Sequence, residues 1–309
     1  MPLSVAEIVA QSVELSGAQG YTGNFRELGG GEINETFLLD CGEHSLILRI
    51  ARYADQQSLH REAVALEQLT LDRVPQLVFF NPESRIDGRV WILETHVPGK
   101  TVERLNVAQF RSLGELLAQV HAVRTEQVGV DAWQFFLDGC RTFGDENALL
   151  NHPNARLRAL ITRTQSYVQA NQSLLNAVVL ALRHGDATPG NVLVDGDMAS
   201  LIDWELSSFA DPMSEFSTIY YDDMEYNRGK WRVHITPEER AALFEGYEAA
   251  GGTIDEARVQ MWMTIDKIGA AVFLYWRIHE SGRLADNEQL AQYRLDLENL
   301  VQSLERTLH

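Results

Sequence analysis

The chain has 309 residues and carries 26 Lys and Arg against 44 Asp and Glu, which gives a formal net charge of −18. An excess of acid repels phosphate backbones and anionic lipid surfaces, so neither nucleic acid nor a membrane is an expected partner. The only lysines are Lys100, Lys230 and Lys267. Any mechanism that needs a lysine before residue 100 is therefore excluded.

The composition and the cysteines indicate an ordinary folded protein. Hydrophobic residues make up 45% of the chain and charged residues 23%, enough apolar material for a sizeable core or two smaller ones. Glu7 interrupts the stretch where a signal peptide would need apolar residues, and the longest apolar run, 268–276, is too short to cross a bilayer. Cys41 and Cys140 lie far apart without a CxxC pattern, so we expect neither a disulfide framework nor a zinc site. A cytoplasmic location is the expectation.

The first 97 residues have the pattern of a small β-rich region. After a short helical start, alternating apolar residues and turn signals predict strands, and three-to-four spacing of leucines and alanines predicts one amphipathic helix. The predicted strands are 25–28, 35–39, 45–50, 76–80 and 89–96, and the predicted helix is 56–71.

The rest of the chain is predicted to be mainly helical. Apolar residues recur at helical spacing in 110–123, 154–171, 237–250, 255–279 and 289–308. The exception is 184–203, where two runs with valine or isoleucine flank an Asp-Gly-Asp turn. We therefore predict an α+β fold of two lobes, with a small antiparallel-β lobe over 1–97 that carries one main helix and a larger, mostly helical lobe over 98–309.

The segment from His184 to Glu205 carries the most specific chemistry. Phosphoryl transfer needs a carboxylate that orients or deprotonates an attacking hydroxyl and oxygen ligands for Mg²⁺. Asp186 and Asn191 stand five residues apart, the Asp-to-Asn spacing of the kinase motif HRDxxxxN, and Asp203 follows an apolar strand as the DFG aspartate does. Taken alone, the motif also fits a tight turn with a helix cap.

The order of motifs resembles that of the aminoglycoside phosphotransferase and choline kinase family. His184-Gly185-Asp186 with Asn191 matches the family's HGDxxxxN loop. The resemblance covers about residues 22–218 and implies a bilobal protein-kinase-like fold, in which 1–97 is the nucleotide-binding lobe and 98–309 the catalytic and substrate-binding lobe. It implies that Asp186 is the catalytic base and that Asn191 and Asp203 bind Mg²⁺.

The resemblance also implies a nucleotide site in the first lobe. The glycine-rich approach Gly29-Gly30-Gly31 with Asn34 would lie over the phosphates, where side chains have no room. The segment from Glu94 through Thr95 and His96 to Val97 would meet the base of ATP or GTP through backbone groups. Pro98-Gly99 then ends the strand.

Arg49 stands where protein kinases have a lysine. Glu62 follows where the family has its helix-borne glutamate, and the implied ion pair would aim the guanidinium at the α- and β-phosphates. Two other readings stay open at this point. Arg49 fits a surface residue on an edge strand, and Arg52 is the second candidate for the phosphate contact.

The acceptor is less defined. Asp222, Asp223 and Glu225 cluster with Tyr221, and carboxylates with aromatic faces suit an ammonium-bearing molecule, although a solvated acidic helix face has the same composition. We expect a small cationic acceptor of aminoglycoside or choline type, with ketosamine or homoserine kinase-like specificity as a variant.

Two other classes of function share parts of this sequence pattern. A nucleotide-binding pseudokinase or interaction module is the alternative that Arg49 leaves open. A protein kinase is disfavoured, because Asp211-Pro212 follows Asp203 after only eight residues, without a long activation loop. The expected assembly is a monomer or a weak homodimer.

Overall fold

The computed structural model describes residues 3–29, 34–52, 57–219, 227–228, 231–232, 235–280 and 287–309. The chain forms two compact units. The first contains residues 1–102, 184–186 and 191–208, and the second contains 103–183, 187–190 and 209–309. The residues of the HGDxxxxN motif that carry the predicted chemistry thus belong to the same unit as the N-terminal residues. The functional boundary expected after residue 97 stays a prediction.

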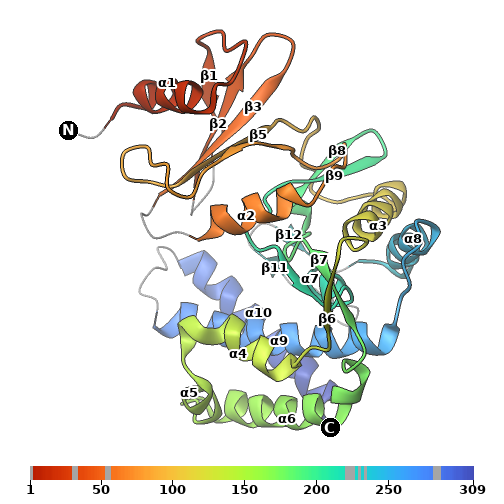
Figure 1. Ribbon diagram of the computed structural model, residues 1–309. Helices are drawn as coiled ribbons and strands as arrows, with labels where there is room; N and C mark the ends of the chain where they lie inside the picture. The colour runs from red at the N-terminus through yellow and green to blue at the C-terminus, as the bar shows by residue number, and fades with distance from the viewer. Residues whose placement is uncertain are drawn as a thin grey trace. The chain divides into compact units, whose positions relative to one another are not determined.

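The first unit is built on a five-stranded sheet, whose pairs are all antiparallel (Figure 1). The strands lie in the order β1, β2, β3, β5, β4. Their bounds are Phe25–Glu27 for β1, Asn34–Asp40 for β2, Ser45–Ala51 for β3, Leu77–Phe80 for β4 and Trp91–Thr95 for β5. The predicted antiparallel sheet is confirmed. Because β3 lies in the middle of it, the edge-strand interpretation of Arg49 is wrong.

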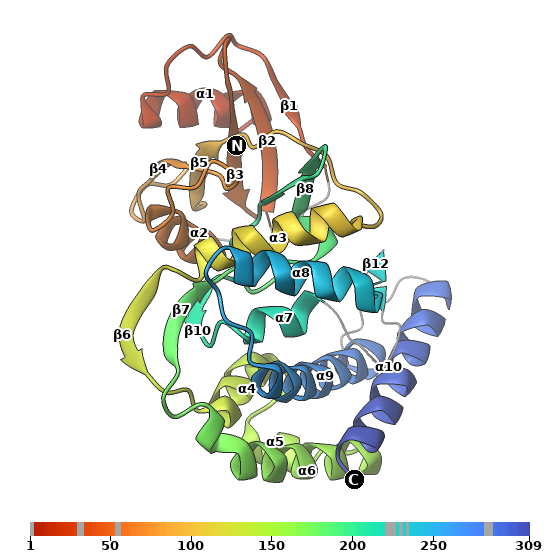
Figure 2. The ribbon, with the colours of Figure 1, turned by 90° about the vertical axis from the view of Figure 1, so that its right-hand side faces the viewer.

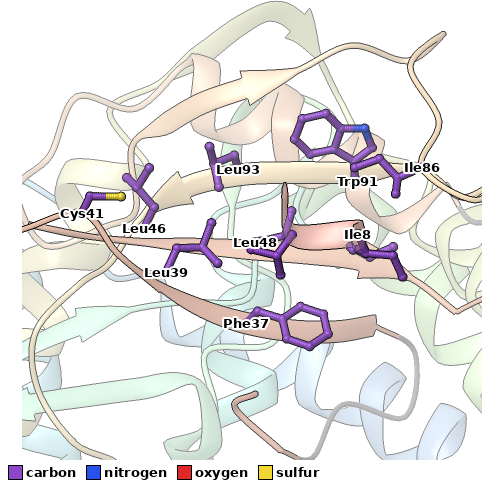
Figure 3. Packing of buried hydrophobic residues seen from close by; sticks show 11 residues of the cluster. Ile8, Phe37, Leu39, Cys41, Leu46, Leu48, Ile86, Trp91 and Leu93 are labelled. Atoms are coloured by element: carbon purple, nitrogen blue, oxygen red, sulfur yellow. The ribbon is translucent and has the colours of Figure 1, made fainter. Parts of the chain in front are cut away.

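One face of this sheet forms an apolar core. Helix α1 (Val5–Ser16) packs on that face through Ile8 and Val9, and it begins at Ser4, which caps it with Glu7. Figure 3 shows side chains from β2, β3 and β5 meeting there. The strand residues are Phe37, Leu39, Leu46, Leu48, Ile50, Trp91 and Leu93. All are at most 3% exposed, so every second residue of β3 and β5 is committed to this core.

The intervening residues of β3 and β5 point to the opposite face. There Arg49 and Glu94 share one side of the sheet with helix α2 (Ser58–Glu67), which lies against β3, β4 and β5. Glu62 is on the buried side of α2 and has no exposed surface. The two-residue period of the strands therefore brings three ionisable side chains together on the face away from the apolar core.

A hairpin completes the first unit. Strands β8 (Val192–Asp195) and β9 (Met198–Leu201) pair antiparallel on either side of the predicted Asp-Gly-Asp turn. Val194 also exchanges two backbone hydrogen bonds with Lys100, of 2.9 and 3.1 Å. The hairpin thereby holds Asn191 at its start and Asp203 just after its end within the first unit.

The second unit is mainly helical (Figures 1 and 2). Its long helices are α3 (Val107–Val120), α6 (Ala155–Asn171), α8 (Pro237–Ala249), α9 (Glu256–His279) and α10 (Asn287–Thr307). These are the five predicted helices. The first starts three residues earlier than predicted, because Asn106 and Gln109 cap each other's backbone N–H groups at its start.

The shorter elements of the second unit lie between α3 and α8 in the sequence. They are β6 (Arg124–Val128), α4 (Ala132–Cys140), η1 (Arg141–Phe143), α5 (Glu146–Leu150), η2 (Gln172–Leu174), β7 (Val179–Arg183), η3 (Pro189–Asn191), β10 (Ser208–Ala210), α7 (Ser214–Ile219), β11 (Asn227–Arg228) and β12 (Trp231–Arg232), with Ser208 and Asn191 themselves in the first unit. Strands β6, β7 and β10 form a three-stranded sheet. Within the described residues, no helix is long and apolar enough to cross a membrane.

The buried Asp211 carboxylate links separate segments of the second unit by hydrogen bonds. Its Oδ1 accepts hydrogen bonds from Arg258 (3.0 Å) and from the Met213 backbone (3.0 Å), and its Oδ2 accepts one from the indole of Trp262 (2.8 Å). Asp211 has no exposed surface and Trp262 is 2% exposed. The carboxylate therefore connects the start of α7 to α9, and Trp262 is part of the buried packing of this unit.

Helices α3 and α8 lie side by side (Figure 2), in close backbone contact at two glycines. A Cβ atom at Gly114 would lie 2.0 Å from the Leu243 carbonyl oxygen, and one at Gly246 would lie 2.0 Å from that of Arg111. We expect Gly114→Ala to lower the free energy of unfolding by about 1–3 kcal/mol, because the helices must separate. Gly269→Ala, where nothing lies within 4 Å, is the matched control and should stabilise α9 by about 0.5–1 kcal/mol. Urea unfolding of both variants measures the difference, and equal stability would contradict the packing.

Candidate active site

The centre of the site is a buried ion pair between β3 and α2. The Arg49 Nη1 donates a hydrogen bond to Glu62 Oε1, and the two side chains are 8% and 0% exposed. Burial alone would lower the pKa of the Arg49 guanidinium, but Glu62 and Asp203 raise it, so the group stays charged. The predicted Arg49–Glu62 pair is present in the structure. Arg52 instead lies 3.6 Å from Glu35 and is more exposed.

Arg49 also reaches the two carboxylates that follow β9. Its Nη2 donates to Asp203 Oδ1 at 2.8 Å and lies 3.7 Å from Glu205 Oε2. Burial, followed by the charge of Asp203, raises the pKa of Glu205. One guanidinium thus lies within ion-pair distance of three carboxylates.

Glu62 links helix α2 to the Asp203 segment through a second hydrogen bond. Its Oε1 also accepts from the Trp204 backbone N–H at 3.1 Å. Burial raises the pKa of Glu62 to about 7, against the opposing effect of Arg49. Since the same oxygen holds Arg49 and the residue after Asp203, a shift of α2 would move both groups.

Asp186 and Asn191 are joined as the five-residue spacing predicts. The Asn191 side-chain N–H₂ donates to the backbone oxygen of Asp186 (2.9 Å) and to its Oδ2 (3.0 Å). Because the amide nitrogen is turned to Asp186, the amide oxygen of Asn191 is the atom left to face a cation. The tight-turn interpretation is also correct locally, since Pro189–Asn191 form a 3₁₀ turn.

His184 connects the Asp186 segment to the Asp203 segment. Its Nδ1 accepts from the Asp186 backbone N–H (3.2 Å), and its Nε2 lies 2.9 Å from the Ile202 carbonyl oxygen. A ring nitrogen must carry a proton to donate to a carbonyl, so these partners require the Nε2–H form. The ring also meets Trp204 edge to face at 4.6 Å between centroids. His184 therefore positions the loop and is too enclosed, at 0% exposure, to act as the base.

Asp203 itself has a strained backbone. Its φ angle is +67°, a left-handed conformation that non-glycine residues rarely adopt. The neighbouring Ile202 N–H donates to the Asn191 carbonyl oxygen at 3.0 Å, and the Trp204 N–H is held by Glu62. Bonds on both sides thus impose the conformation that turns the Asp203 carboxylate toward Arg49, as expected where strain serves a functional group.

The donor set of these residues fits Mg²⁺. Asp203 offers carboxylate oxygens and Asn191 an amide oxygen, and Mg²⁺ is usually bound by one or two such groups together with phosphate oxygens and water. Among the described residues, no group of three or more His, Cys, Asp or Glu side chains could hold a metal alone. Asp203 and Asn191 would leave the other coordination positions of a bound Mg²⁺ to phosphate oxygens and water.

The other predicted nucleotide contacts have different outcomes. Asn34 begins β2, is 3% exposed and donates from its side chain to Glu205 Oε2 at 2.9 Å. Gly29 is exposed after β1, whereas Gly30 and Gly31 lie outside the described residues. Also outside them are Tyr221, Asp222, Asp223 and Glu225, the residues predicted for the acceptor.

The segment predicted to meet the base lies at the end of β5. The Thr95 N–H donates to Gln76 and the His96 N–H donates to Ser45, whereas the Val97 N–H donates no hydrogen bond within the described part of the chain. Val97 is 5% exposed. Backbone N–H groups of buried residues usually have a partner, so the Val97 N–H is a candidate contact for a ligand.

Sequence reasoning missed two acidic side chains. The sequence motifs assign no role to Glu205, and they assign Glu94 a role only through its backbone. The Glu94 side chain is 3% exposed, and burial, followed by the charge of Glu62, raises its pKa well above the usual range. The signal in the sequence was a lone acid inside an otherwise apolar strand, Trp91–Thr95, two residues from the register partner of Arg49.

A substitution at Gly185 tests whether the backbone next to Asp186 must keep its conformation. Its φ is +84°, and a Cβ there would lie 2.3 Å from the Leu206 carbonyl oxygen. We expect Gly185→Ala to lower both kcat and the free energy of unfolding, because the clash displaces the backbone next to Asp186. The control is Gly196→Ala, which has φ +58° but open space and should cost only about 1 kcal/mol in strain. Enzyme assays and urea unfolding compare the two, and a fully active Gly185→Ala variant would contradict the geometry.

Comparison with known structures supports the kinase-like fold. A thermostable mutant of aminoglycoside phosphotransferase APH(4)-Ia, in a ternary complex with AMP-PNP and hygromycin B, is 17% identical, covers 97% of this chain and 99% of its own, and has a TM-score of 0.65. A choline/ethanolamine kinase family protein from Mesorhizobium loti is 16% identical with a TM-score of 0.62, over 97% and 94% of the two chains. A putative aminoglycoside phosphotransferase from Ralstonia eutropha is 15% identical with a TM-score of 0.68, over 97% of both chains.

The sequence itself decides the family. No curated protein matches the chain. The model of the phosphotransferase enzyme family matches residues 24–262, more than three quarters of the chain, and this range contains Arg49, Asp186, Asn191 and Asp203. The chain therefore belongs to the phosphotransferase enzyme family and is a small-molecule kinase with a protein-kinase-like fold.

Proposed function

We propose that this protein transfers the γ-phosphoryl group of a nucleoside triphosphate to a hydroxyl group of a small cationic molecule. The observation that carries the proposal is that one unit brings together Asp186, Asn191, Asp203 and the Arg49–Glu62 pair. Phosphoryl transfer needs little beyond a positioned base, a metal site and a phosphate anchor, and these residues have the chemistry for each.

In this mechanism Asp186 accepts the proton of the acceptor hydroxyl as its oxygen attacks the γ-phosphorus. The Asn191 side chain holds Asp186 Oδ2, and His184 holds the Asp186 backbone, so the carboxylate is oriented before the acceptor binds. Asn191 and Asp203 would hold Mg²⁺, which neutralises charge on the phosphate oxygens when bound. Arg49, held by Glu62, binds phosphate oxygens with its planar fork.

The acidic balance of the chain supports a cationic acceptor. Residues 101–309 carry 18 bases and 30 acids, a net charge of 18 − 30 = −12, against 8 − 14 = −6 for residues 1–100. The structures with a similar fold include one with hygromycin B bound and one of a choline/ethanolamine kinase family protein. An aminoglycoside or an amino alcohol is therefore the acceptor class to test first, with ketosamines and amino-acid alcohols next.

The test is a Mg·ATP and Mg·GTP consumption screen over amino alcohols, aminoglycosides, ketosamines, amino-acid alcohols and neutral or anionic sugars. We expect turnover with a cationic acceptor and its loss in Asp186→Ala. Turnover restricted to neutral or anionic sugars would refute the cationic acceptor. A thermal shift with Mg·ATP without transfer to any acceptor would instead indicate a nucleotide-binding module that has lost turnover.

A further inference from the structure

One oxygen of the buried Glu94 carboxyl group has no hydrogen-bond partner within the described residues. The side chain is 3% exposed, and its Oε2 accepts no hydrogen bond within the described residues. A buried polar atom of this kind costs free energy unless something binds it, so most have a partner. The nearby charge of Arg49 acts to lower the pKa of Glu94, but no nitrogen of Arg49 donates a hydrogen bond to this oxygen.

The position of Glu94 places it beside the expected path of a nucleotide. Its side chain is on the same sheet face as Arg49, the proposed phosphate anchor. Three residues later, at most about 10 Å along the chain, comes the unpartnered N–H of Val97. A nucleotide whose phosphates meet Arg49 and whose base meets Val97 would pass Glu94 with one edge of the base.

A protonated Glu94 carboxyl group can distinguish adenine from guanine by its hydrogen bonds. Burial and the neighbouring Glu62 favour the neutral acid, which has one acceptor oxygen and one O–H donor. Adenine presents the complementary pair at one edge, with the N6 amino donor beside the N7 acceptor, whereas guanine presents two acceptors, O6 and N7, at the same edge. Guanine would leave the carbonyl oxygen of Glu94 facing O6.

We propose that Glu94 makes a two-point contact with N6 and N7 of adenine and thereby selects adenine over guanine nucleotides. This inference rests on the proposed function, because it places the base of the phosphoryl donor. The Val97 N–H supports the same choice, since adenine N1 accepts a hydrogen bond where guanine carries a proton.

The test measures binding without turnover. Isothermal titration calorimetry with Mg²⁺ compares ADP, GDP, inosine diphosphate and 7-deaza-ADP on the wild-type protein. A bidentate contact to a base discriminates by about 5- to 150-fold, so we expect GDP and inosine diphosphate to bind at least about fivefold more weakly than ADP. The affinity for 7-deaza-ADP, which lacks only the N7 acceptor, should lie between the affinities for ADP and GDP.

Variants of Glu94 separate the contact from general effects. Glu94→Gln keeps one donor and one acceptor and should preserve the preference for ADP, whereas Glu94→Met has similar size and should lose it. Glu67→Met, an exposed position on α2, is the matched control. Equal affinity of the wild-type protein for ADP and GDP, or an unchanged preference in Glu94→Met, would overturn this inference and leave the phosphotransferase proposal intact. If none of these nucleotides binds, the proposed phosphotransferase function is itself wrong.

Discussion

We expect Asp186→Asn to lower kcat by about 10²–10⁴-fold while nucleotide binding remains measurable, because the amide cannot accept the proton of the acceptor hydroxyl. The substitution keeps the size of the side chain and an oxygen that can accept from Asn191. Steady-state kinetics with the acceptor found in the screen gives kcat, and calorimetry with ADP gives the nucleotide affinity.

The control for Asp186 is Asp197→Asn, in the exposed turn between β8 and β9. This variant removes a carboxylate close in sequence without touching the loop, so its kcat should match that of the wild-type protein. If Asp186→Asn retains full kcat, another group deprotonates the acceptor and the assignment of the base is wrong.

Arg49→Met should have the largest effect on stability. It leaves Glu62 buried without the cation that it shares with Asp203, and removing one partner of a buried ion pair costs about 3–5 kcal/mol. We expect the free energy of unfolding at pH 8 to fall by about 3 kcal/mol, the lower end of that range. Glu62 can bind a proton, and this removes part of the cost of a buried charge without a cation. Nucleotide affinity should fall as well, since the phosphate anchor is lost.

The pH dependence of this effect has a definite sign. The pKa of Glu62 is raised to about 7 in the folded protein, so its contribution to stability is present below the unfolded pKa of 4.5 and is lost as pH rises through 7. Without Arg49 that pKa rises further. The stability difference between wild type and Arg49→Met should therefore be small at pH 5 and larger at pH 8.

Urea unfolding at the two pH values measures this difference. Arg85→Met, which removes an exposed arginine of the same unit, is the control and should change stability by less than about 0.5 kcal/mol. The free energy of unfolding of Arg49→Lys should lie between those of the wild-type protein and Arg49→Met. The ammonium group of lysine keeps the charge but lacks the planar fork that reaches Glu62 and Asp203 together. If Arg49→Met loses the same free energy of unfolding at pH 5 and at pH 8, Arg49 does not stabilise the ionised form of Glu62.

Local patterns of the sequence were sufficient for most of the architecture. Alternating and helical spacing predicted the strands of the antiparallel sheet, helix α2 and the five long helices, because those periods report directly which side of an element is buried. The Asp186 to Asn191 spacing predicted a contact that depends only on one turn of chain. The scarcity of lysine likewise left Arg49 as the basic partner of Glu62, and the structure pairs them.

Tertiary structure decided everything that depends on residues distant along the chain. Glu205 and Asp203 lie more than 150 positions from Arg49, and no periodicity reports that one guanidinium would reach both. The burial of Glu94 depends on sheet order, since β5 lies inside the sheet beside β3 and turns this acid toward the face that α2 covers. The sequence by itself determined the family and the residue types of the site. Only the fold determined how many carboxylates share Arg49, because the Coulomb interaction depends on distance in space and not along the chain.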